Sequence, residues 1–271
     1  MTVDLTAILS PPDAPSPVLH RYGAPSWPVL ERESADLATC LGDRLLDHVA
    51  PDGPRLADLR VLDFGAGAGV VTQVLRQRLT IPSDACDRDR TAMERLAERL
   101  PAVACRPHAQ TPPLPYADAT FDAIYADTTW LRLPPSAGLV WLQEIVRILK
   151  EGAVALIPIC GPGGVRQFRE AARPGWHAVT DADLTRTGAL HMPFGPASAR
   201  DGDDAFGRTA YTHGHILATW EPIVPVEAIY PQAIDALDLV VVRRRRPVSA
   251  PKKRQPRGPF RRLRSRLAKP G

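Results

Sequence analysis

The chain has 271 residues, of which 44% are hydrophobic, so it can bury one sizeable core, alone or with an appended subdomain. It contains no run of about 18 apolar residues and no secretory pattern at its N-terminus, so we expect a cytoplasmic protein. Its four cysteines include no Cys-x-x-Cys pair, which suggests neither a zinc site nor a disulfide framework.

Charge is distributed unevenly along the chain. The net charge is +4, but residues 243–271 hold 13 of the 34 lysines and arginines and none of the 30 acids, which leaves residues 1–242 with a net charge of −9. Proline clusters at residues 11–28, which indicates an extended segment. We therefore expect a proline-rich leader at 1–28, one domain over 29–242 and a disordered basic tail at 243–271.

Apolar residues at helical spacing predict four helices in the first part of the chain. The first covers residues 37–49, the second carries Val70, and the third covers about 90–100. The fourth is expected to stop at Gly152, and its stripe consists of Leu139, Leu142, Val146 and Leu149.

Short apolar runs predict strands between and after these helices. They are expected at residues 60–64, 83–86, 102–105, 120–126, 153–159, 223–230 and 237–242. Strands that alternate with helices imply a parallel sheet covered on both faces. The last two strands are too close in sequence for a helical crossover, so they should be antiparallel. Residues 161–207 match no regular pattern, and we expect an irregular insertion on the substrate side of a cleft.

The run RVLDFGAGAGVV, residues 60–71, joins a strand to a helix through Gly65, Gly67 and Gly69. Glycines at the first βα turn of an open sheet allow a nucleotide-like ligand to approach the backbone closely. The dinucleotide fingerprint G-x-G-x-x-G fits imperfectly, because Val70 occupies its third glycine position. Asp63 would repel a pyrophosphate but suits a ligand with an ammonium and a sulfonium group, as in S-adenosylmethionine. A tight turn without a ligand is the structural alternative.

Several blocks of the sequence resemble class I S-adenosylmethionine-dependent methyltransferases. VLDFGAGAG resembles motif I of that family, and CDRDRTAMERLAERL, LPYADATFDAIYA and EIVRILKEGAVALI are similar to its later blocks, so the resemblance covers about residues 58–160. The C-terminal run from RTAYTHGHILATW to LDLVVVRR is similar to methyltransferases that accompany glycosyltransferases in glycan assembly. The resemblance implies an α/β fold with a Rossmann-like, doubly wound, mostly parallel seven-stranded sheet and an antiparallel C-terminal hairpin.

The resemblance also implies roles for the glycine loop. Gly65, Ala66, Gly67 and Gly69 would wrap the methionine part of S-adenosylmethionine, and Asp63 would steer its ammonium group.

Further cofactor contacts are implied at the ends of the later strands. Asp87 follows Gly65 by 22 residues and would accept hydrogen bonds from both ribose hydroxyls. Arg88 stands where the family usually has an apolar residue against adenine, so its guanidinium would stack there or point away. Gln110 replaces a common acid and would accept a bond from the adenine amino group. Ala126 and Asp127 would complete the pocket.

Methyl transfer to a hydroxyl needs an aligned acceptor and is accelerated by a base that takes the acceptor's proton. Candidate bases are His213, His215, Asp127 and, with less support, His191. Tyr211 and His213 would share one face of an extended run, so we prefer His213, with Asp127 as the second candidate. A histidine with a purely structural role at the sheet edge is also compatible. The HGH triplet lacks a third ligand at a suggestive spacing, so we expect no metal site.

Three functions fit these patterns. The first is a methyltransferase of a small molecule or glycan, here expected to methylate a hydroxyl; the others are a nucleic-acid methyltransferase and a noncatalytic S-adenosylmethionine-binding module. The negative body and the run ADTTW at 126–130, in place of an N-P-P-Y-type tetrad, disfavour nucleic acid. Tyr22 and Trp27 in the leader would either cover the pocket or anchor the leader to the core.

The basic tail has a pattern of its own. Phe260, Leu263 and Leu267 follow helical spacing among arginines, which predicts a short basic amphipathic helix. An anionic membrane surface would attract such a helix and place the protein peripherally at the membrane. Nucleic-acid binding and a solvated tail without a partner are the alternatives.

Overall fold

A computed structural model describes residues 27–49, 58–79, 83–126, 128–173, 175–194 and 206–246. The leader up to residue 26, the candidate base Asp127 and the tail beyond Arg246 therefore lie outside the described residues. The first described helix, α3, begins at Trp27, so the final two residues of the expected leader belong to that helix.

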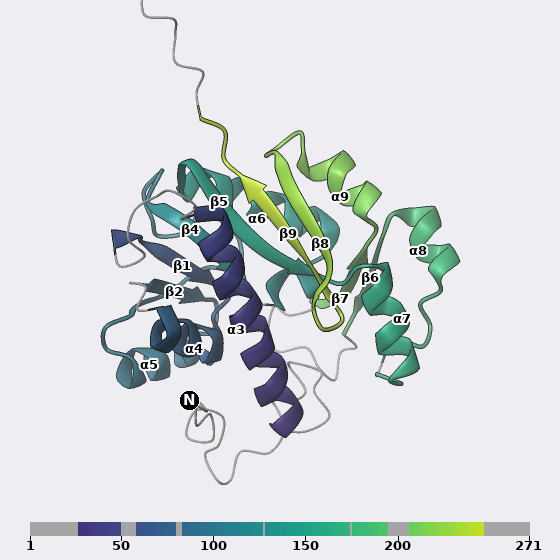
Figure 1. Ribbon diagram of the computed structural model, residues 1–271, viewed down its shortest axis with the longest axis horizontal. Coiled ribbons are helices and arrows are strands. Elements are labelled where there is room, and N and C mark those ends of the chain that lie inside the picture. Colours follow the sequence, from purple (N-terminus) through teal and green to yellow (C-terminus); the bar gives the residue numbers. More distant parts are fainter. Residues whose placement is uncertain are drawn as a thin grey trace, which may run out of the picture.

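A seven-stranded sheet forms the centre of the fold, in the order β3-β2-β1-β4-β5-β9-β8 (Figure 1). Its strands are β1 (Val61–Phe64), β2 (Ser83–Asp87), β3 (Ala104–Pro107), β4 (Phe121–Ala126), β5 (Leu149–Ile159), β8 (Val226–Ile234) and β9 (Leu237–Arg243). Strands β1 to β5 are parallel, and β9 is antiparallel to both β5 and β8. The predicted fold class, including its antiparallel C-terminal hairpin, is confirmed. A separate hairpin pairs β6 (Ala189–Pro193) with β7 (Gly207–Tyr211).

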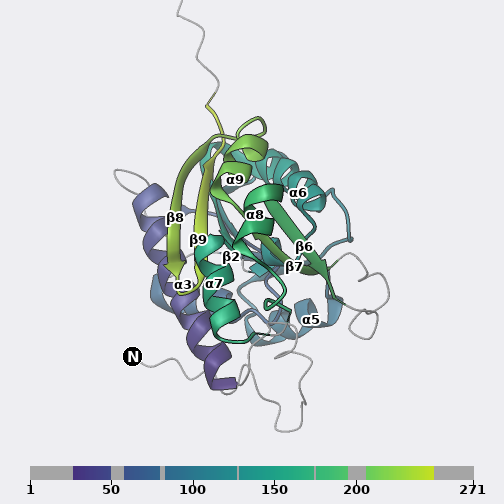
Figure 2. The same cartoon turned by 90° about the vertical axis from the view of Figure 1, so that its right-hand side faces the viewer.

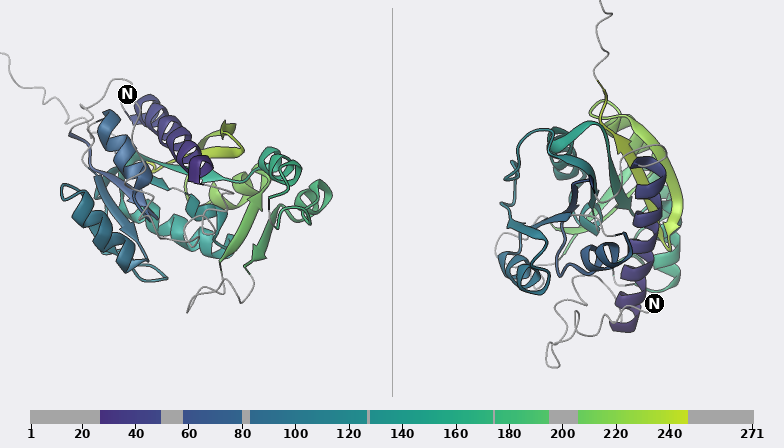
Figure 3. Two further views of the ribbon diagram at one scale, coloured as in Figure 1. Left: turned by 90° about the horizontal axis from the view of Figure 1, so that it is seen from below. Right: turned by 60° about the vertical axis from the view of Figure 1, so that its left-hand side comes forward.

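Helices cover both faces of the seven-stranded sheet. One face carries α3 (Trp27–Val49), α4 (Val70–Leu79) and α5 (Arg90–Arg99). The other carries α6 (Pro135–Ile148), α9 (His213–Trp220) and the 3₁₀-helix η2 (Thr128–Leu131), so the sheet lies between α3 and α6 (Figure 2). The remaining helices, α7 (Pro162–Glu170) and α8 (Asp181–Thr187), lie with the β6–β7 hairpin at the end of the molecule away from α5 (Figure 3).

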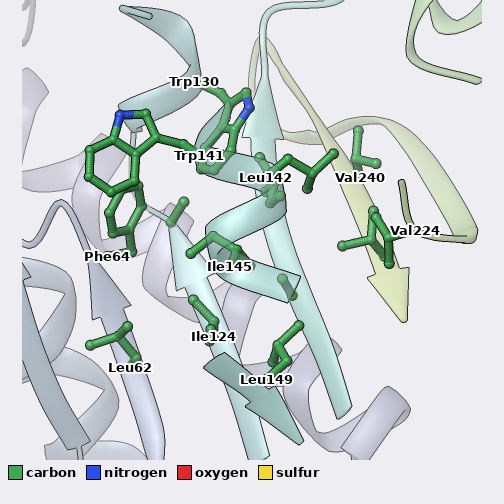
Figure 4. Close-up of a cluster of buried hydrophobic side chains, with 14 of the residues drawn as sticks. Leu62, Phe64, Ile124, Trp130, Trp141, Leu142, Ile145, Leu149, Val224 and Val240 are labelled. Atoms are coloured by element: carbon green, nitrogen blue, oxygen red, sulfur yellow. The ribbon is translucent and has the colours of Figure 1, made fainter. Parts of the chain in front are cut away.

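The largest core cluster lies directly behind the end of β1. Successive residues of a strand face opposite sides, so Leu62 and Phe64 enter the cluster under α6 while Val61 packs under α3 and α4. Phe64 lies beside Trp141 of α6, with ring centroids 5.1 Å apart, and Trp130 of η2 is next to them (Figure 4). This packing holds the carboxyl end of β1, and with it the start of the glycine loop, in place.

The predicted fourth helix ends earlier than expected. Helix α6 stops at Ile148 and not at Gly152, because Leu149 adopts extended backbone angles (φ −68°, ψ 142°) and begins β5. Leu149 pairs with Phe121 of β4, so sheet pairing takes over where the helical stripe was expected to continue. The large apolar buried residues of α6 are Trp141, Leu142, Ile145 and Ile148.

Residues 161–207 are more regular than expected, since they contain α7, α8 and β6. Pro162 occupies the first turn of α7 directly after Gly161, a position that suits its fixed φ. Thr180 caps α8 by accepting the backbone N–H of Asp183 at 3.0 Å. The prediction of an irregular insertion is wrong for these elements; residues 174 and 195–205 lie outside the described part. Among the described helices, none is both long enough and apolar enough to cross a bilayer.

Candidate active site

The glycine loop follows β1 at the carboxyl edge of the parallel strands. Gly65, Gly67 and Gly69 all have left-handed backbone angles, with φ of 81°, 52° and 72°. Such angles cost an L-residue roughly 1–2 kcal/mol, so glycine is the suitable residue at each position. The N–H groups of Gly65 and Ala66 donate to the carbonyl of Cys86 in β2, at 2.8 and 3.1 Å. The loop is therefore tied to the neighbouring strand and has a defined shape.

A threonine from η2 packs directly over Gly65. A Cβ atom placed on Gly65 would lie 2.1 Å from Oγ1 of Thr129, so the missing side chain at Gly65 is what allows this approach. The Thr129 hydroxyl donates to the carbonyl of Phe64 at 3.3 Å. No sequence pattern indicated Thr129, because its contact with the loop depends on the parallel pairing of β1 with β4.

Asp63 lies inside the sheet below the glycine loop. Its exposed fraction is 0%, and its Oδ2 accepts a hydrogen bond of 2.5 Å from the hydroxyl of Thr72 in α4. The side chain thus places a carboxylate beneath the backbone of the loop and not on its surface.

Asp87 connects the end of β2 to the glycine loop. Its Oδ2 accepts the N–H of Gly67 at 2.9 Å, and its Oδ1 accepts the N–H of Asp89 at 2.8 Å. Each carboxylate oxygen has a second acceptor position, so both can still receive a hydroxyl proton. The two acids predicted from the sequence, Asp63 and Asp87, thus flank the same loop from below and from the side.

The other predicted cofactor residues surround this edge. Ala66 and Ala126 are buried, at 4% and 1% exposure, and Ala126 ends β4. Gln110 is exposed three residues after β3. Arg88 extends toward the small hairpin, where its guanidinium carbon lies 4.2 Å from the ring centroid of Phe206. A guanidinium over an aromatic ring is an attractive contact, and here it joins the end of β2 to the segment before β7.

His108 is a further polar side chain at this edge that the sequence analysis did not single out. Its ring stacks on Phe64 with centroids 5.6 Å apart and meets Trp141 edge-on at 5.2 Å. Its backbone N–H donates to the carbonyl of Asp87 at 3.1 Å. Burial lowers the pKa of the His108 imidazole, so its neutral form is favoured. The one sequence feature that could have pointed to His108 is its position between the end of β3 and the candidate residue Gln110.

His213, the preferred base, lies at the first position of α9 and not in an extended run with Tyr211. The strand β7 ends at Tyr211, and Thr212 caps the helix by accepting the N–H of His215 at 3.1 Å. The prediction that Tyr211 and His213 share one face of a strand is therefore wrong. His213 instead forms a 2.5 Å hydrogen bond between its Nε2 and Oδ2 of Asp238.

Asp238 places this pair at the same edge of the sheet as the glycine loop. It lies on β9 opposite Ile159, the last residue of β5, and the carboxyl ends of parallel strands share one edge. Its exposed fraction is 1%, whereas the His213 side chain is 35% exposed. The pair is therefore a buried carboxylate that contacts a solvent-accessible imidazole.

The remaining candidate bases are arranged differently. His191 of β6 is hydrogen-bonded to Oγ1 of Thr209 at 2.7 Å, on the hairpin that packs against η2. His215 lies on α9, where burial lowers the pKa of its imidazole. Within the described residues, no group of three or more histidines, cysteines and acids is arranged to hold a metal ion.

The comparisons with known proteins agree on the class of fold. Residues 61–152 match the model of a methyltransferase domain family. Among solved structures, a protein from Pyrococcus horikoshii OT3 is 14% identical, with 77% of this chain and 90% of that chain covered and a TM-score of 0.55. An S-adenosylmethionine-dependent methyltransferase from Methanosarcina mazei is 15% identical, with 70% and 93% covered and a TM-score of 0.51.

A third similar structure is CalS10, an amino pentose methyltransferase from Micromonospora echinaspora involved in calicheamicin biosynthesis. It is 17% identical, with 84% of this chain and 95% of that chain covered and a TM-score of 0.53. The search of curated proteins finds no match. At these identities the solved structures establish a common fold.

The matched domain and the fold define the class of this protein: residues 61–152 form a methyltransferase domain, and the described residues have the class I methyltransferase fold. CalS10 was solved with S-adenosylmethionine bound.

Proposed function

We propose that this methyltransferase transfers its methyl group to a hydroxyl of a small molecule or glycan. The observation that carries the proposal is the His213–Asp238 pair at the cofactor edge, since a hydroxyl acceptor must lose a proton and an accessible imidazole can take it. The similarity to an amino pentose methyltransferase favours a sugar-like acceptor.

The cofactor would be held by the residues around the glycine loop. Asp87 accepts the ribose hydroxyls, and Gly65, Ala66, Gly67 and Gly69 form the backbone cradle for the methionine part. When bound, S-adenosylmethionine supplies a methyl group made electrophilic by its sulfonium. The loop fits this ligand for two reasons. Glycine adopts the left-handed backbone angles that the turn needs, and it has no Cβ atom to block close approach of the ligand to the backbone.

The charge of the cofactor is matched by the acids at the loop. Asp63 stabilises the ammonium and sulfonium charges from beneath the loop, while Ala126 closes the pocket at the end of β4. We assign Gln110 to the adenine edge. Arg88 contacts Phe206 and thereby holds the acceptor-side hairpin to the ribose end of the pocket.

The acceptor side is formed by the insertion at 161–207, within a catalytic domain that begins with α3 at Trp27 and ends with β9 at Arg243. Its elements have their own small core, in which Val165 of α7, Trp176 and Leu184 of α8 pack on Cys160 at the end of β5. This core rests on the carboxyl edge of the sheet, where an acceptor would meet the cofactor.

Replacing His213 with alanine is expected to lower turnover about tenfold or more while the affinity for S-adenosylmethionine stays nearly unchanged, since the base acts on the acceptor only. Acceptors are found by incubating the protein with methyl-labelled S-adenosylmethionine and a panel of monosaccharides, nucleoside diphosphate sugars and phenols, with mass spectrometry of the products. Glu221→Ala, which changes an exposed side chain directly after α9 and outside the insertion, is the matched control. A methyl group found on carbon or nitrogen would overturn the hydroxyl assignment. Unchanged turnover of His213→Ala would mean that His213 is not the base, so that either Asp127 is the base or the enzyme acts only by positioning the acceptor.

We also propose that the basic tail attaches the enzyme to an anionic membrane surface, so that it acts in the cytoplasm at the membrane periphery. The tail leaves the fold at the amino end of β5, opposite the glycine loop, beside a hollow of about 500 Å³ that is bordered by residues 243–246. Arg243 donates to the carbonyls of Gly152 and His48 at 2.7 and 3.0 Å. Arg244 donates to the carbonyl of Arg147 at 3.0 Å. These two arginines therefore belong to the folded body, and the attachment begins after them.

The full chain is expected to cosediment with anionic vesicles at low salt, and a chain that ends at Arg246 is expected to remain in solution, because each basic residue near the surface contributes roughly 1 kcal/mol. Ending at Arg246 keeps the contacts of Arg243 and Arg244 intact. Neutral vesicles and a double-stranded RNA are the controls. Binding to RNA without binding to anionic vesicles would contradict the membrane proposal. Equal binding by a Phe260, Leu263 and Leu267 triple alanine would exclude the amphipathic helix.

A further inference from the structure

A carboxylate with almost no solvent exposure is the feature of the candidate active site that the proposed function does not by itself explain. Asp238 is 1% exposed, and burial of a charged carboxylate is costly unless it is hydrogen-bonded. Its Oδ1 accepts the backbone N–H of Gln232 at 2.8 Å, and its Oδ2 contacts Nε2 of His213 at 2.5 Å. Both oxygens are thus occupied by groups from different elements.

The surroundings of Asp238 fix its orientation. A Cβ atom on Gly161 would lie 1.7 Å from Oδ2, so the backbone at the start of α7 lies against the carboxylate. The neighbouring thiol of Cys160 is buried, and its burial together with the charge of Asp238 keeps the thiol pKa well above its ordinary value, so that group is neutral. Among the described residues, His213 supplies the side chain that contacts Oδ2 of Asp238.

These contacts determine which nitrogen of His213 carries the proton. An ionised carboxylate only accepts hydrogen bonds, so Nε2 must be the protonated nitrogen in the neutral imidazole. The lone pair then lies on Nδ1. A buried negative charge next to the ring also stabilises the imidazolium that forms when Nδ1 takes a proton.

We propose that Asp238 is a positioning residue that holds His213 as the Nε2–H tautomer, with Nδ1 as the proton acceptor; this rests on the proposed O-methylation. The acceptor hydroxyl would give its proton to Nδ1, and its oxygen would use the O–H electron pair to bond to the methyl carbon. The methyl–sulfur bond would break in the same step, with its electron pair going to the sulfur of S-adenosylhomocysteine as the leaving group. Asp238 itself stays ionised throughout. It touches neither acceptor nor cofactor and acts through the imidazole.

The isosteric change Asp238→Asn provides a specific test. The backbone N–H of Gln232 requires an acceptor, so the amide oxygen takes the place of Oδ1 and the NH₂ group faces His213. Nε2 must then accept a hydrogen bond, which forces the proton onto Nδ1 and removes the lone pair from that nitrogen. Comparable tautomer reversal by an Asp-to-Asn change lowers turnover about 10⁴-fold in a Ser-His-Asp triad.

The tautomer is measured directly by ¹⁵N NMR of the histidine-labelled full chain at alkaline pH, with the His213 signals assigned by their loss in His213→Gln. We expect the Nε2–H tautomer in the parent and the Nδ1–H tautomer in Asp238→Asn. We also expect turnover to fall by about tenfold or more in the variant, as in His213→Ala, with unchanged affinity for S-adenosylmethionine. The matched control is Asp235→Asn, the same change at an exposed acid of the same hairpin.

The outcomes separate this inference from the proposed function. An Nδ1–H tautomer in the parent overturns the inference without any variant, even if Asp238→Asn fails to fold. An unchanged tautomer or unchanged turnover in a folded Asp238→Asn protein also overturns it. If no methylated hydroxyl is found in any acceptor, the proposed function fails, and the parent tautomer still decides whether Asp238 orients His213.

Discussion

Substitution of Gly65 by alanine is expected to weaken binding of S-adenosylmethionine by about tenfold or more. Gly65 has a φ of 81°, and a Cβ atom would lie 2.1 Å from Oγ1 of Thr129. The alanine loop will relax away from this shape in the free protein, so binding must restore a left-handed conformation that costs roughly 1–2 kcal/mol, in addition to the displacement of Thr129. A cost of about 1.4 kcal/mol is tenfold in affinity. Isothermal titration calorimetry with the cofactor and with its demethylated product measures the change.

Two further proteins make this result interpretable. Gly214→Ala is the matched control, because Gly214 has no heavy atom within 4 Å of an added Cβ, and we expect parental affinity. The double variant Gly65→Ala with Thr129→Ala separates the two contributions, since it removes the clash with Oγ1 and leaves the backbone strain. Parental affinity in Gly65→Ala alone would show that the glycine loop does not bind the cofactor.

Substitution of Asp87 by alanine is expected to weaken cofactor binding by about 10- to 150-fold. The variant would lack the charge-assisted hydrogen bonds between the carboxylate and the ribose, which contribute roughly 1.5–3 kcal/mol. The same change removes the acceptor for the N–H of Gly67, at 2.9 Å, so the glycine loop also loses its attachment to β2. Asp87→Asn should have an intermediate effect, because the amide keeps one acceptor oxygen.

Asp89→Ser is the control for charge. It removes a negative charge two residues away, and serine can retain the cap that Asp89 provides to the N–H of Ala92 at 3.0 Å. We expect its cofactor affinity to match the parent. If Asp87→Ala binds the cofactor as tightly as Asp89→Ser does, Asp87 is not part of the cofactor site.

The geometry of the glycine loop was predictable because its signals are local. The strand, the glycine turn and the helix follow one another within residues 60–71, and Asp87 ends the very next strand. Gly65, Gly67 and Gly69 have the left-handed angles that their residue type suggests. Segments that are neighbours in the chain are therefore also neighbours in the fold here.

The contacts of the proposed acceptor side could not be predicted in the same way, because they join distant segments. Arg88 meets Phe206, and His213 meets Asp238 through the arrangement of α9 and β9. The orientation of His213 was still readable in part, since a threonine before it is a common helix cap and argues against an extended run.

The end of α6 shows a conflict between local and tertiary preferences. The stripe through Leu149 satisfies helical spacing, yet that residue pairs with Phe121 and the N–H of Gly152 donates to the carbonyl of Arg244 at 2.9 Å. Propensity differences of a few tenths of a kcal/mol per residue are smaller than the gain from completing the sheet. Pairing of this kind depends on strands far along the chain.

The position of β9 has a consequence for biosynthesis. It is the last described strand in chain order, yet it lies between β5 and β8, within the sheet. Until residues 237–243 have left the ribosome, β5 has an open edge and β8 has no partner in the sheet. Strands β5 and β9 are far apart in the chain, and such pairings form slowly. An unpaired apolar edge meanwhile favours aggregation. The nascent enzyme therefore has to be kept from self-association until β9 inserts, and a chain that stops short of it is expected to be cleared rather than to fold.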